Sequence, residues 1–293
     1  MKIAAIDIGS NAIRLLIEEV HRHENQWRID KVSLTRVPVR LGDDVFRTGR
    51  ISDEKLRQLV KTMRAFWYLM DVHQIEMFRV CATSAMREAK NRKKVIETVE
   101  REANFRIEIL SGELEAQLIF KNYFHQNLNS KGNYVYLDVG GGSTEITLIN
   151  KGKRIKGQSF DLGTVRSLAG GIDPNVWLDV QQWLKSLKTM PDKRIAIGTG
   201  GNINTLFKLQ GKKPNDLLTL DELKNLYKLL EPLTVDERIF NFKLRPDRAD
   251  VIIPACEIYI KILQLAGIKE MLVPKIGLSD GMILDMVDQI KIE

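Results

Sequence analysis

The chain has 293 residues, of which 44% are hydrophobic and 28% charged, and it carries a formal net charge of +7. A chain of this length tends to divide into two domains, and no apolar run reaches the roughly 18 residues that a membrane-spanning helix needs. The positive excess suits a polyanionic partner, yet the basic residues are spread along the chain and form no nucleic-acid-binding motif. Composition therefore predicts a two-domain globular protein without a nucleic-acid or membrane partner.

The two cysteines, Cys81 and Cys256, lie in apolar stretches. They are expected to be buried thiols of a protein in a reducing compartment, because a disulfide framework needs more cysteines. The apolar start of the chain is interrupted by Asp7 and is too short for a secretory signal peptide. These features predict a cytoplasmic location.

The chain opens with three predicted strands, at residues 2–8, 13–21 and 27–37, joined by short turns. Strands connected in this way form an antiparallel meander, here at the start of a mixed sheet. The polar residues 40–49 are expected to form a loop.

A long helix is predicted after Ser52, which is a favourable N-cap residue. Its apolar residues recur every three or four positions and so face the core: Leu56, Leu59, Val60, Met63, Phe66, Trp67 and Met70. A βαβ pattern follows, with a strand at 75–81, a helical stretch after Ser84, a helix at 91–103, a strand at 105–110 and a helix at 112–127.

Residues 127–132 are polar and rich in turn formers, so they are the best candidate for a linker between domains 1–126 and 127–293. The second domain is predicted to contain strands at 134–139, 144–151, 154–161, 194–198 and 270–274, and helices at 175–189, 202–209, 220–231 and 247–266. The last helix, about 279–291, is a candidate for packing back on the first domain.

Both halves open with the same device, at residues 6–11 and 137–144: an apolar strand, an aspartate, a glycine turn, a hydroxyl residue and the next strand. One strand ending in Asp-x-Gly is common, but two in register indicate a duplicated unit.

Such turns suit phosphate binding, because glycine lets the backbone approach a phosphate and point its N–H groups at the oxygens. The hydroxyls of Ser10, Ser143 and Thr144 can add donors. Asp7 and Asp138, at the strand ends, would face each other across a closed cleft and could hold a hydrated Mg²⁺. The alternative for each turn is a tight hairpin without a ligand. A third glycine cluster, at residues 198–202, lies between a strand and a helix, where another anion could bind.

Together these segments resemble the exopolyphosphatase/guanosine pentaphosphate phosphatase (Ppx/GppA) family of the actin-like ATPase superfamily. The matching segments are residues 7–11, 82–89 (Ala-Thr-Ser-Ala-Met-Arg-Glu-Ala), 111–116 (Ser-Gly-Glu-Leu-Glu-Ala), 138–145, 198–201, 248–252 and 279–281. The resemblance implies an α/β, two-lobed actin-like (ribonuclease H-like) fold. Each lobe would contain a mixed five-stranded sheet flanked by helices, with the active site in the interdomain cleft.

The resemblance also implies an activity: release of terminal phosphate from inorganic polyphosphate, guanosine pentaphosphate or both, by glutamate-activated water with Mg²⁺. Glu115 corresponds to the catalytic glutamate, and Asp138 and Glu145 to acidic residues near the metal and the attacked phosphate. With Asp7, these two form the expected metal site. Without the resemblance, the favoured interpretation of Glu115 is a first-turn glutamate that stabilises a helix N-terminus, and the resemblance reverses this preference.

The expected phosphate-binding residues come from the three glycine clusters and one arginine: Gly9, Ser10, Asn11, Arg87, Gly140, Gly141, Gly142, Ser143, Thr144, Gly200 and Gly201. Arg87 would be a bidentate donor to phosphate oxygens, although a plain surface arginine is the alternative. Arg14 and Arg166 are weaker candidates.

Longer family members carry a C-terminal extension resembling HD-type phosphohydrolases. The four histidines of this chain are scattered and none adjoins an aspartate, so no HD metal site is expected. The resemblance further implies a homodimer. Two alternatives stay open: an actin-like kinase that transfers phosphate from ATP, and a non-catalytic binder of polyphosphate or of a guanosine alarmone.

Overall fold

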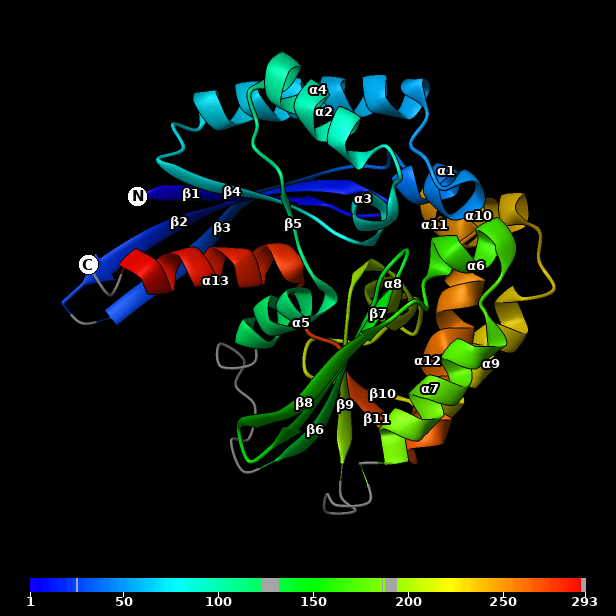
Figure 1. The fold of residues 1–293 in the computed structure, drawn as a ribbon. Coiled ribbons are helices and arrows are strands. Elements are labelled where there is room, and N and C mark those ends of the chain that lie inside the picture. The colour runs from blue at the N-terminus through cyan, green and yellow to red at the C-terminus, as the bar shows by residue number, and fades with distance from the viewer. Residues whose placement is uncertain (25, 123–131, 186, 188–193, 291–293) are drawn as a thin grey trace. The chain divides into compact units, whose positions relative to one another are not determined.

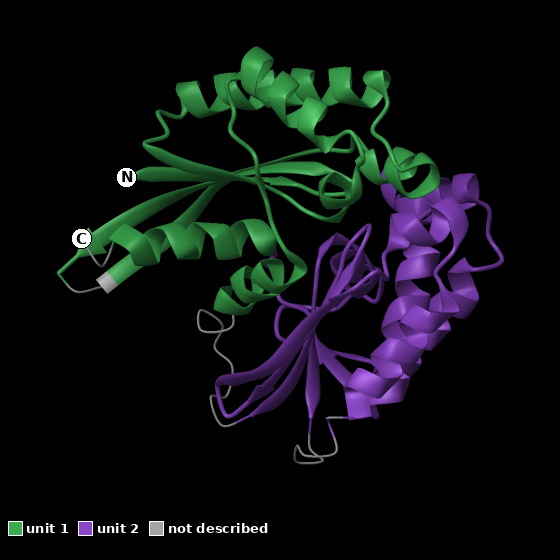
Figure 2. Ribbon diagram, viewed as in Figure 1, with its two compact units in different colours: residues 1–122, 278–293 green, residues 123–277 purple. Residues whose placement is uncertain are grey.

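The computed structural model describes residues 1–24, 26–122, 132–185, 187 and 194–290. The chain divides into two compact units, shown in Figure 2: residues 1–122 with 278–293 form unit 1, and residues 123–277 form unit 2. The expected boundary at residues 126–127 lies outside the described residues, as does most of the expected linker. The last helix belongs to unit 1.

Unit 1 is built on a mixed five-stranded sheet with the order β3-β2-β1-β4-β5 (Figure 1). The strands are β1 (Lys2–Ile8), β2 (Ile13–His23), β3 (Gln26–Val37), β4 (Met77–Ala82) and β5 (Glu108–Ile109). The first three form the expected antiparallel meander, and β4 lies parallel to β1. Only two residues of the strand expected at 105–110 pair with the sheet.

Helices cover both faces of this sheet: α2 and α4 lie on one face, and α5 and α13 on the other (Figure 1). The helices of unit 1 are α1 (Leu41–Thr48), α2 (Asp53–Val72), α3 (Ser84–Glu88), α4 (Arg92–Ala103), α5 (Gly112–Lys121) and α13 (Leu278–Ile290). The side chain of Ser52 caps α2 by accepting a hydrogen bond from the Lys55 N–H at 3.2 Å. The apolar stripe of α2 packs into the core as expected, whereas Trp67 is partly exposed.

The polar loop expected at residues 40–49 is wrong, because most of it forms α1. Leu41 and Val45, one helical turn apart, are buried in the core of unit 1 and anchor the helix. Gly49 ends it in a left-handed conformation and donates its N–H to the Val45 carbonyl. Two apolar residues four positions apart were a helical signal that the surrounding charges obscured.

Unit 2 is built on a mixed sheet of six strands, one more than expected, with the order β10-β11-β9-β6-β7-β8. The strands are β6 (Asn133–Val139), β7 (Thr144–Asn150), β8 (Lys153–Phe160), β9 (Ile195–Thr199), β10 (Leu217–Thr219) and β11 (Glu270–Leu272). The extra strand is β10, which pairs antiparallel with β11. Three residues are too few for a period-two pattern to stand out in the sequence.

The helices of unit 2 are α6 (Thr164–Gly170), α7 (Pro174–Leu184), α8 (Gly201–Leu209), α9 (Leu220–Leu230), α10 (Val235–Phe242), α11 (Pro246–Ala249) and α12 (Ile252–Ala266). The helix expected at 247–266 is divided into α11 and α12. The sequence prediction missed α6 and α10, although α10 begins with a capping box between Thr234 and Glu237.

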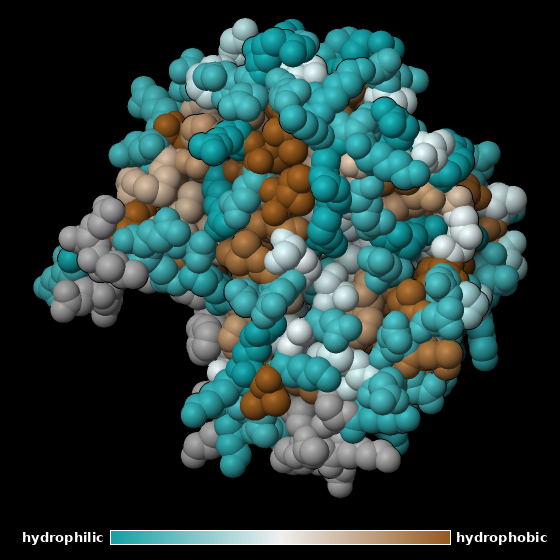
Figure 3. All heavy atoms as spheres, in the orientation of Figure 1, coloured by the Kyte–Doolittle hydropathy of each residue, from teal (hydrophilic) through white to brown (hydrophobic). Residues whose placement is uncertain are grey.

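The surface seen in Figure 3 is mostly hydrophilic, with hydrophobic side chains in patches of limited extent. Within the described part of the chain, no helix has the length and hydropathy of a membrane-spanning segment.

Helix α13 is held in unit 1 by ion pairs and by close backbone packing. Asp285 of α13 lies 2.8 Å from Arg79 Nη1 and 2.6 Å from Lys121 Nζ. Gly281 lies against α5 so closely that a Cβ atom there would collide with the Leu118 carbonyl oxygen. Glycine at this position is therefore required by the contact between two helices.

We expect Gly281→Ala to lower the free energy of unfolding by about 1–3 kcal/mol, because the added methyl group overpacks the α5–α13 contact. Urea unfolding measures this change. Gly170→Ala is the matched control, because Gly170 also lies in a helix and its Cβ position is open. A Gly281→Ala protein at least as stable as the wild type would contradict the prediction.

A buried carboxylate on β2 makes the stability of unit 1 depend on pH. Glu18 lies opposite Lys31 on β3 and is 7% exposed. The pKa of Glu18 is raised from 4.5 to about 7. Burial is the largest cause, the charge of Asp280 on α13 acts in the same direction, and Lys31 acts against both. A carboxyl with a raised pKa stabilises the fold below its unfolded pKa, and this contribution is lost as the pH rises through 7.

Glu18→Gln should therefore stabilise the protein at pH 8 by about 1–3 kcal/mol relative to wild type, with little difference at pH 4. Chemical unfolding at the two pH values tests this. Glu19→Gln, with a more exposed carboxylate on the same strand, is the control. A stability difference for Glu18→Gln that does not change between pH 4 and pH 8 would refute the assignment.

Candidate functional site

The glycine turn between β1 and β2 is closed by a hydrogen bond from the Gly9 N–H to the Ala12 carbonyl at 3.1 Å. The carbonyl of Ser10 accepts from the Gly42 N–H at 2.8 Å, and that of Asn11 from the Arg40 N–H at 3.0 Å. In a planar trans peptide the next N–H points opposite to the carbonyl. The N–H groups of Asn11 and Ala12 therefore point away from the start of α1.

The turn between β6 and β7 has the same geometry. The Gly140 N–H donates to the Ser143 carbonyl at 2.9 Å, again three residues along the chain. The structure thus confirms the duplicated strand–turn–strand device at residues 6–11 and 137–144.

The start of α6 orients this second turn. The carbonyls of Gly140 and Gly141 accept hydrogen bonds from N–H groups of the first turn of α6, and that of Gly142 accepts from Arg166 Nε at 2.7 Å. The N–H groups of Gly141, Gly142 and Ser143 consequently all point to the side opposite α6. Successive N–H groups that converge in this way form an anion-binding nest.

Gly163 makes this arrangement possible and was missed in the sequence prediction. A Cβ atom at Gly163 would collide with the backbone of Gly141 and Gly142. Only glycine therefore lets the chain leaving β8 run against the turn. The available signal was the Gly-Thr pair directly after the predicted strand.

Two of the hydroxyls expected to donate to a phosphate, those of Ser10 and Thr144, form hydrogen bonds within their own unit. Ser10 Oγ accepts a hydrogen bond from the Ala85 N–H at 3.2 Å and lies 2.9 Å from Ser84 Oγ, so it ties the turn to α3. Thr144 Oγ1 donates its single proton to the Leu162 carbonyl. In this geometry the backbone N–H groups, more than these hydroxyls, are the donors that a ligand would meet.

Glu115 and Arg87 lie together in unit 1. Ser111 caps α5 by accepting from the Leu114 N–H, which places Glu115 in the first turn of that helix. Glu115 is 7% exposed, and its Oε2 atom lies 3.5 Å from Arg87 Nη1. Arg87 also donates to the Leu110 carbonyl at 2.9 Å. The two residues are 28 positions apart, and only folding brings the buried carboxylate beside its cation.

Asp7, expected as a metal ligand, pairs with the arginine opposite it on β2. Its Oδ2 atom lies 2.7 Å from Arg14 Nη1, and its side chain is almost completely buried. Burial raises the pKa of Asp7, and the neighbouring Arg14 acts in the opposite direction. Arg14 thus compensates a buried carboxylate, and its contact with a phosphate stays a prediction.

Asp138 and Glu145 are directly opposite each other on β6 and β7. Ser159 Oγ donates to Glu145 Oε1 at 2.7 Å, which orients the second carboxylate. Two carboxylates opposite each other on one sheet face repel unless a cation lies nearby. Mg²⁺ commonly binds one or two carboxylates plus substrate phosphates and water, so this pair fits a magnesium ion. The described residues contain no cluster of three or more His, Cys, Asp or Glu side chains that could hold a metal by themselves.

The third glycine cluster packs against this carboxylate pair. Gly200 has a φ of 98°, and a Cβ atom there would lie 2.8 Å from Asp138 Oδ1. Arg248 lies against Gly201 and donates from Nη1 to Asn202 Oδ1 at 2.7 Å. Unit 2 therefore brings Asp138, Glu145, Gly200 and Gly201 into one neighbourhood.

Tyr259 of α12 contacts the end of β9, just before the third glycine cluster. The sequence prediction missed this residue. Its hydroxyl donates to the Thr199 carbonyl at 2.7 Å. Burial raises its pKa well above the usual value, and the charge of Asp138 adds to this effect. A neutral tyrosine therefore fixes the end of β9, from which Gly200 follows.

Residues 17–172 match the model of the Ppx/GppA phosphatase family. The chain belongs to this family. Its members are phosphatases, so the match favours hydrolysis over the kinase and binder alternatives. The actin-like fold expected from the resemblance is confirmed, whereas the cleft between the lobes stays a prediction because each unit is described by itself.

Curated relatives agree with this assignment. Exopolyphosphatase 2 of Mycobacterium tuberculosis is 28% identical over 314 residues, an alignment that covers 97% of this chain and 98% of the relative. A bifunctional 3-dehydroquinate synthase/phosphatase of Fusobacterium nucleatum is 34% identical over 167 residues, which are 56% of this chain and 25% of that larger protein.

Solved structures show the same fold. An exopolyphosphatase from Cytophaga hutchinsonii superposes with a TM-score of 0.86 at 24% identity, covering 99% of this chain and 98% of that structure. The Aquifex aeolicus member of the Ppx/GppA family gives a TM-score of 0.76 at 26% identity, with the same coverage.

Proposed function

We propose that this protein hydrolyses phosphoric anhydrides and releases the terminal phosphate of inorganic polyphosphate. The observation that carries the proposal is the nest of three N–H groups at Gly141–Ser143, fixed by α6 and adjoining two carboxylates. A full-length relative named exopolyphosphatase supports polyphosphate as the substrate.

Glu115 is proposed to accept a proton from the attacking water. The water oxygen bonds to the terminal phosphorus, and the bond from that phosphorus to the bridging oxygen breaks. Arg87, beside Glu115, would donate to the oxygens of the same phosphate. The backbone N–H groups of the glycine turns would bind charge that develops on the phosphate, which is the main source of catalysis in phosphoryl transfer.

Asp138 and Glu145 are the residues proposed to hold Mg²⁺. The ion would neutralise phosphate charge when bound. The pairing of Asp7 with Arg14 leaves Asp7 a less suitable direct ligand in this geometry.

Guanosine pentaphosphate is the second candidate substrate, because the family covers both activities and its terminal phosphoanhydride is chemically the same. We also propose a homodimer in the reducing cytoplasm. The cytoplasmic location is supported by Cys81 and Cys256, which are buried free thiols. Burial raises the pKa of each thiol to about 12.

We expect Glu115→Gln to lower kcat for phosphate release from polyphosphate by roughly 10²–10⁴-fold, because the variant keeps the side-chain size but cannot accept the proton. Dissociation constants measured by calorimetry should change little. Glu113→Gln removes an exposed carboxylate from the same helical turn and is the matched control. Wild-type turnover in Glu115→Gln would remove this residue from its proposed role.

Arg87→Ala should raise KM for polyphosphate roughly tenfold at low salt, because a charge-assisted hydrogen bond to phosphate is lost. The ratio to wild type should shrink at high salt, where attraction between charges is screened. Steady-state kinetics at two salt concentrations measure both effects, with Arg57→Ala on α2 as the control. An unchanged KM at low salt would count against a phosphate contact.

A further inference from the structure

Unit 2 contains a pocket of about 660 Å³ between the exposed side of α8 and the segment that joins α10 to α11. All ionisable residues that line this basic pocket are cationic: Lys208, Lys212, Lys243, Arg245, Arg248 and Lys275. Gathering cations without an acidic partner is unfavourable unless an anion is bound. The charge pattern therefore indicates a ligand with several negative charges.

Only part of this charge is compensated by the protein. Lys212 Nζ lies 2.6 Å from Glu222 Oε1, and Arg248 donates to Asn202. In contrast, the other four cations are exposed, and within the described residues none of them takes part in an ion pair: Lys208, Lys243, Arg245 and Lys275. At least four positive charges are thus available to a ligand.

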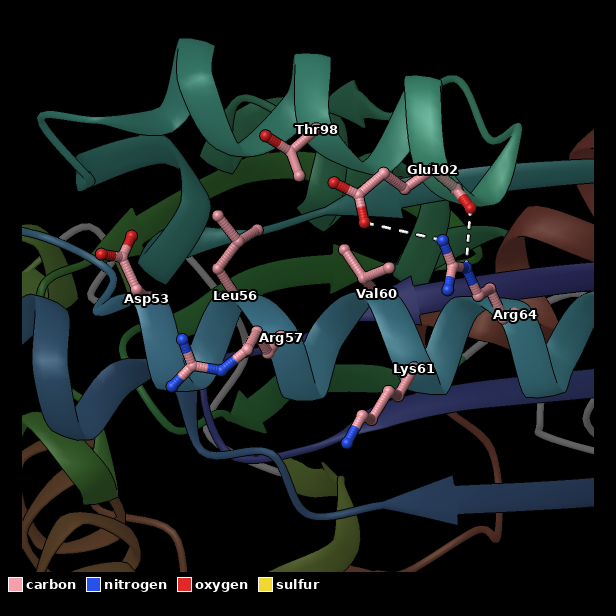
Figure 4. Close-up of a pocket in the computed structure, with 8 residues that line it drawn as sticks. All are labelled: Asp53, Leu56, Arg57, Val60, Lys61, Arg64, Thr98 and Glu102. Carbon is pink, nitrogen blue, oxygen red and sulfur yellow. Dashed lines mark hydrogen bonds and ion pairs between the residues drawn. The ribbon is translucent and has the colours of Figure 1, made fainter.

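A pocket in unit 1 with a mixed-charge lining serves as a comparison (Figure 4). It is also lined by basic residues, among them Arg57 and Lys61, but Asp53 and Glu102 are interspersed with them. Arg64 donates to the Glu102 carbonyl and lies 3.6 Å from its carboxylate. The basic pocket differs from this one because six cations and no acidic side chain line it.

The basic pocket begins next to the candidate site. Gly201 lines it, and the adjoining Gly200 packs against Asp138. Lys208 lies seven residues further along α8, which corresponds to roughly 10 Å at the rise of an α-helix. A ligand in the pocket could thus continue from the glycine cluster as an extended chain.

We propose that the basic pocket binds an oligophosphate chain, at phosphates beyond the one that is hydrolysed. Several lysines that line one pocket match a chain of repeated phosphates, with which they interact as point charges. The chain can be a distal stretch of inorganic polyphosphate or the phosphates of a guanosine nucleotide. The position of the cleaved end rests on the proposed function, whereas binding in the pocket can be measured by itself.

The test is a double variant, Lys208→Gln with Lys243→Gln, which removes two positive charges from the exposed rim. Its dissociation constants for long-chain inorganic polyphosphate and for guanosine pentaphosphate are measured by calorimetry in EDTA over a range of salt concentrations. We expect affinity to fall roughly fivefold to tenfold for at least one of the two ligands. The slope of log affinity against log salt should decrease by roughly one.

The matched control is Arg57→Gln with Lys61→Gln, which removes the same charge from the pocket of Figure 4. A loss confined to polyphosphate, or to the nucleotide, supports the pocket and identifies which source supplies the chain. Unchanged affinity for both ligands, or an equal loss in the control, would overturn the proposal. A wild-type protein that releases no phosphate from either ligand would refute the proposed function alone, because the binding comparison does not use turnover.

Discussion

The candidate site depends on hydrogen bonds that N–H groups at helix N-termini donate to the carbonyl groups of two glycine turns. In unit 2 the first turn of α6 donates to the carbonyls of Gly140 and Gly141, and in unit 1 the start of α1 does the same for Ser10 and Asn11. Because each peptide is planar, fixing a carbonyl on one side fixes the next N–H on the other. A flexible glycine turn thereby becomes a rigid set of donors, and a preorganised donor costs no reorganisation when charge develops on a phosphate.

The two units share this turn geometry but differ in the charged residues beside the turn. The aspartate of unit 1, Asp7, is paired with Arg14 across the β1–β2 hairpin, whereas its counterpart Asp138 is opposite another carboxylate, Glu145. Unit 1 is therefore electrostatically balanced at its turn, and it contributes Glu115 and Arg87 from separate helices. Unit 2 places two carboxylates opposite each other at its turn and gathers cations in the adjoining basic pocket. This division suits a substrate that is both anionic and associated with a cation.

Helix α13 shows how a segment distant in sequence can position chemistry. It packs on α5, which carries Glu115, and the contact at Gly281 leaves no room for a side chain. Its acidic residues pair with cations from three elements of unit 1, namely Lys31, Arg79 and Lys121. The location of the catalytic candidate is thus set partly by residues at the other end of the chain.

The sequence alone determined the opening meander, the amphipathic α2 and the duplicated glycine turns, because these follow from local patterns of period two, period 3.6 and glycine placement. It also singled out Glu115, Arg87, Asp138 and Glu145 through short motifs. Tertiary structure decided the rest: that residues 41–48 form a helix, that Asp7 pairs with Arg14, that Arg87 reaches Glu115, and that Gly163 permits α6 to approach its turn. Arg87 and Glu115 are 28 positions apart, and Gly163 contacts a turn in an earlier segment, so local patterns do not show that these residues meet. Four exposed cations from α8 and from three later positions became one pocket only after the chain had folded.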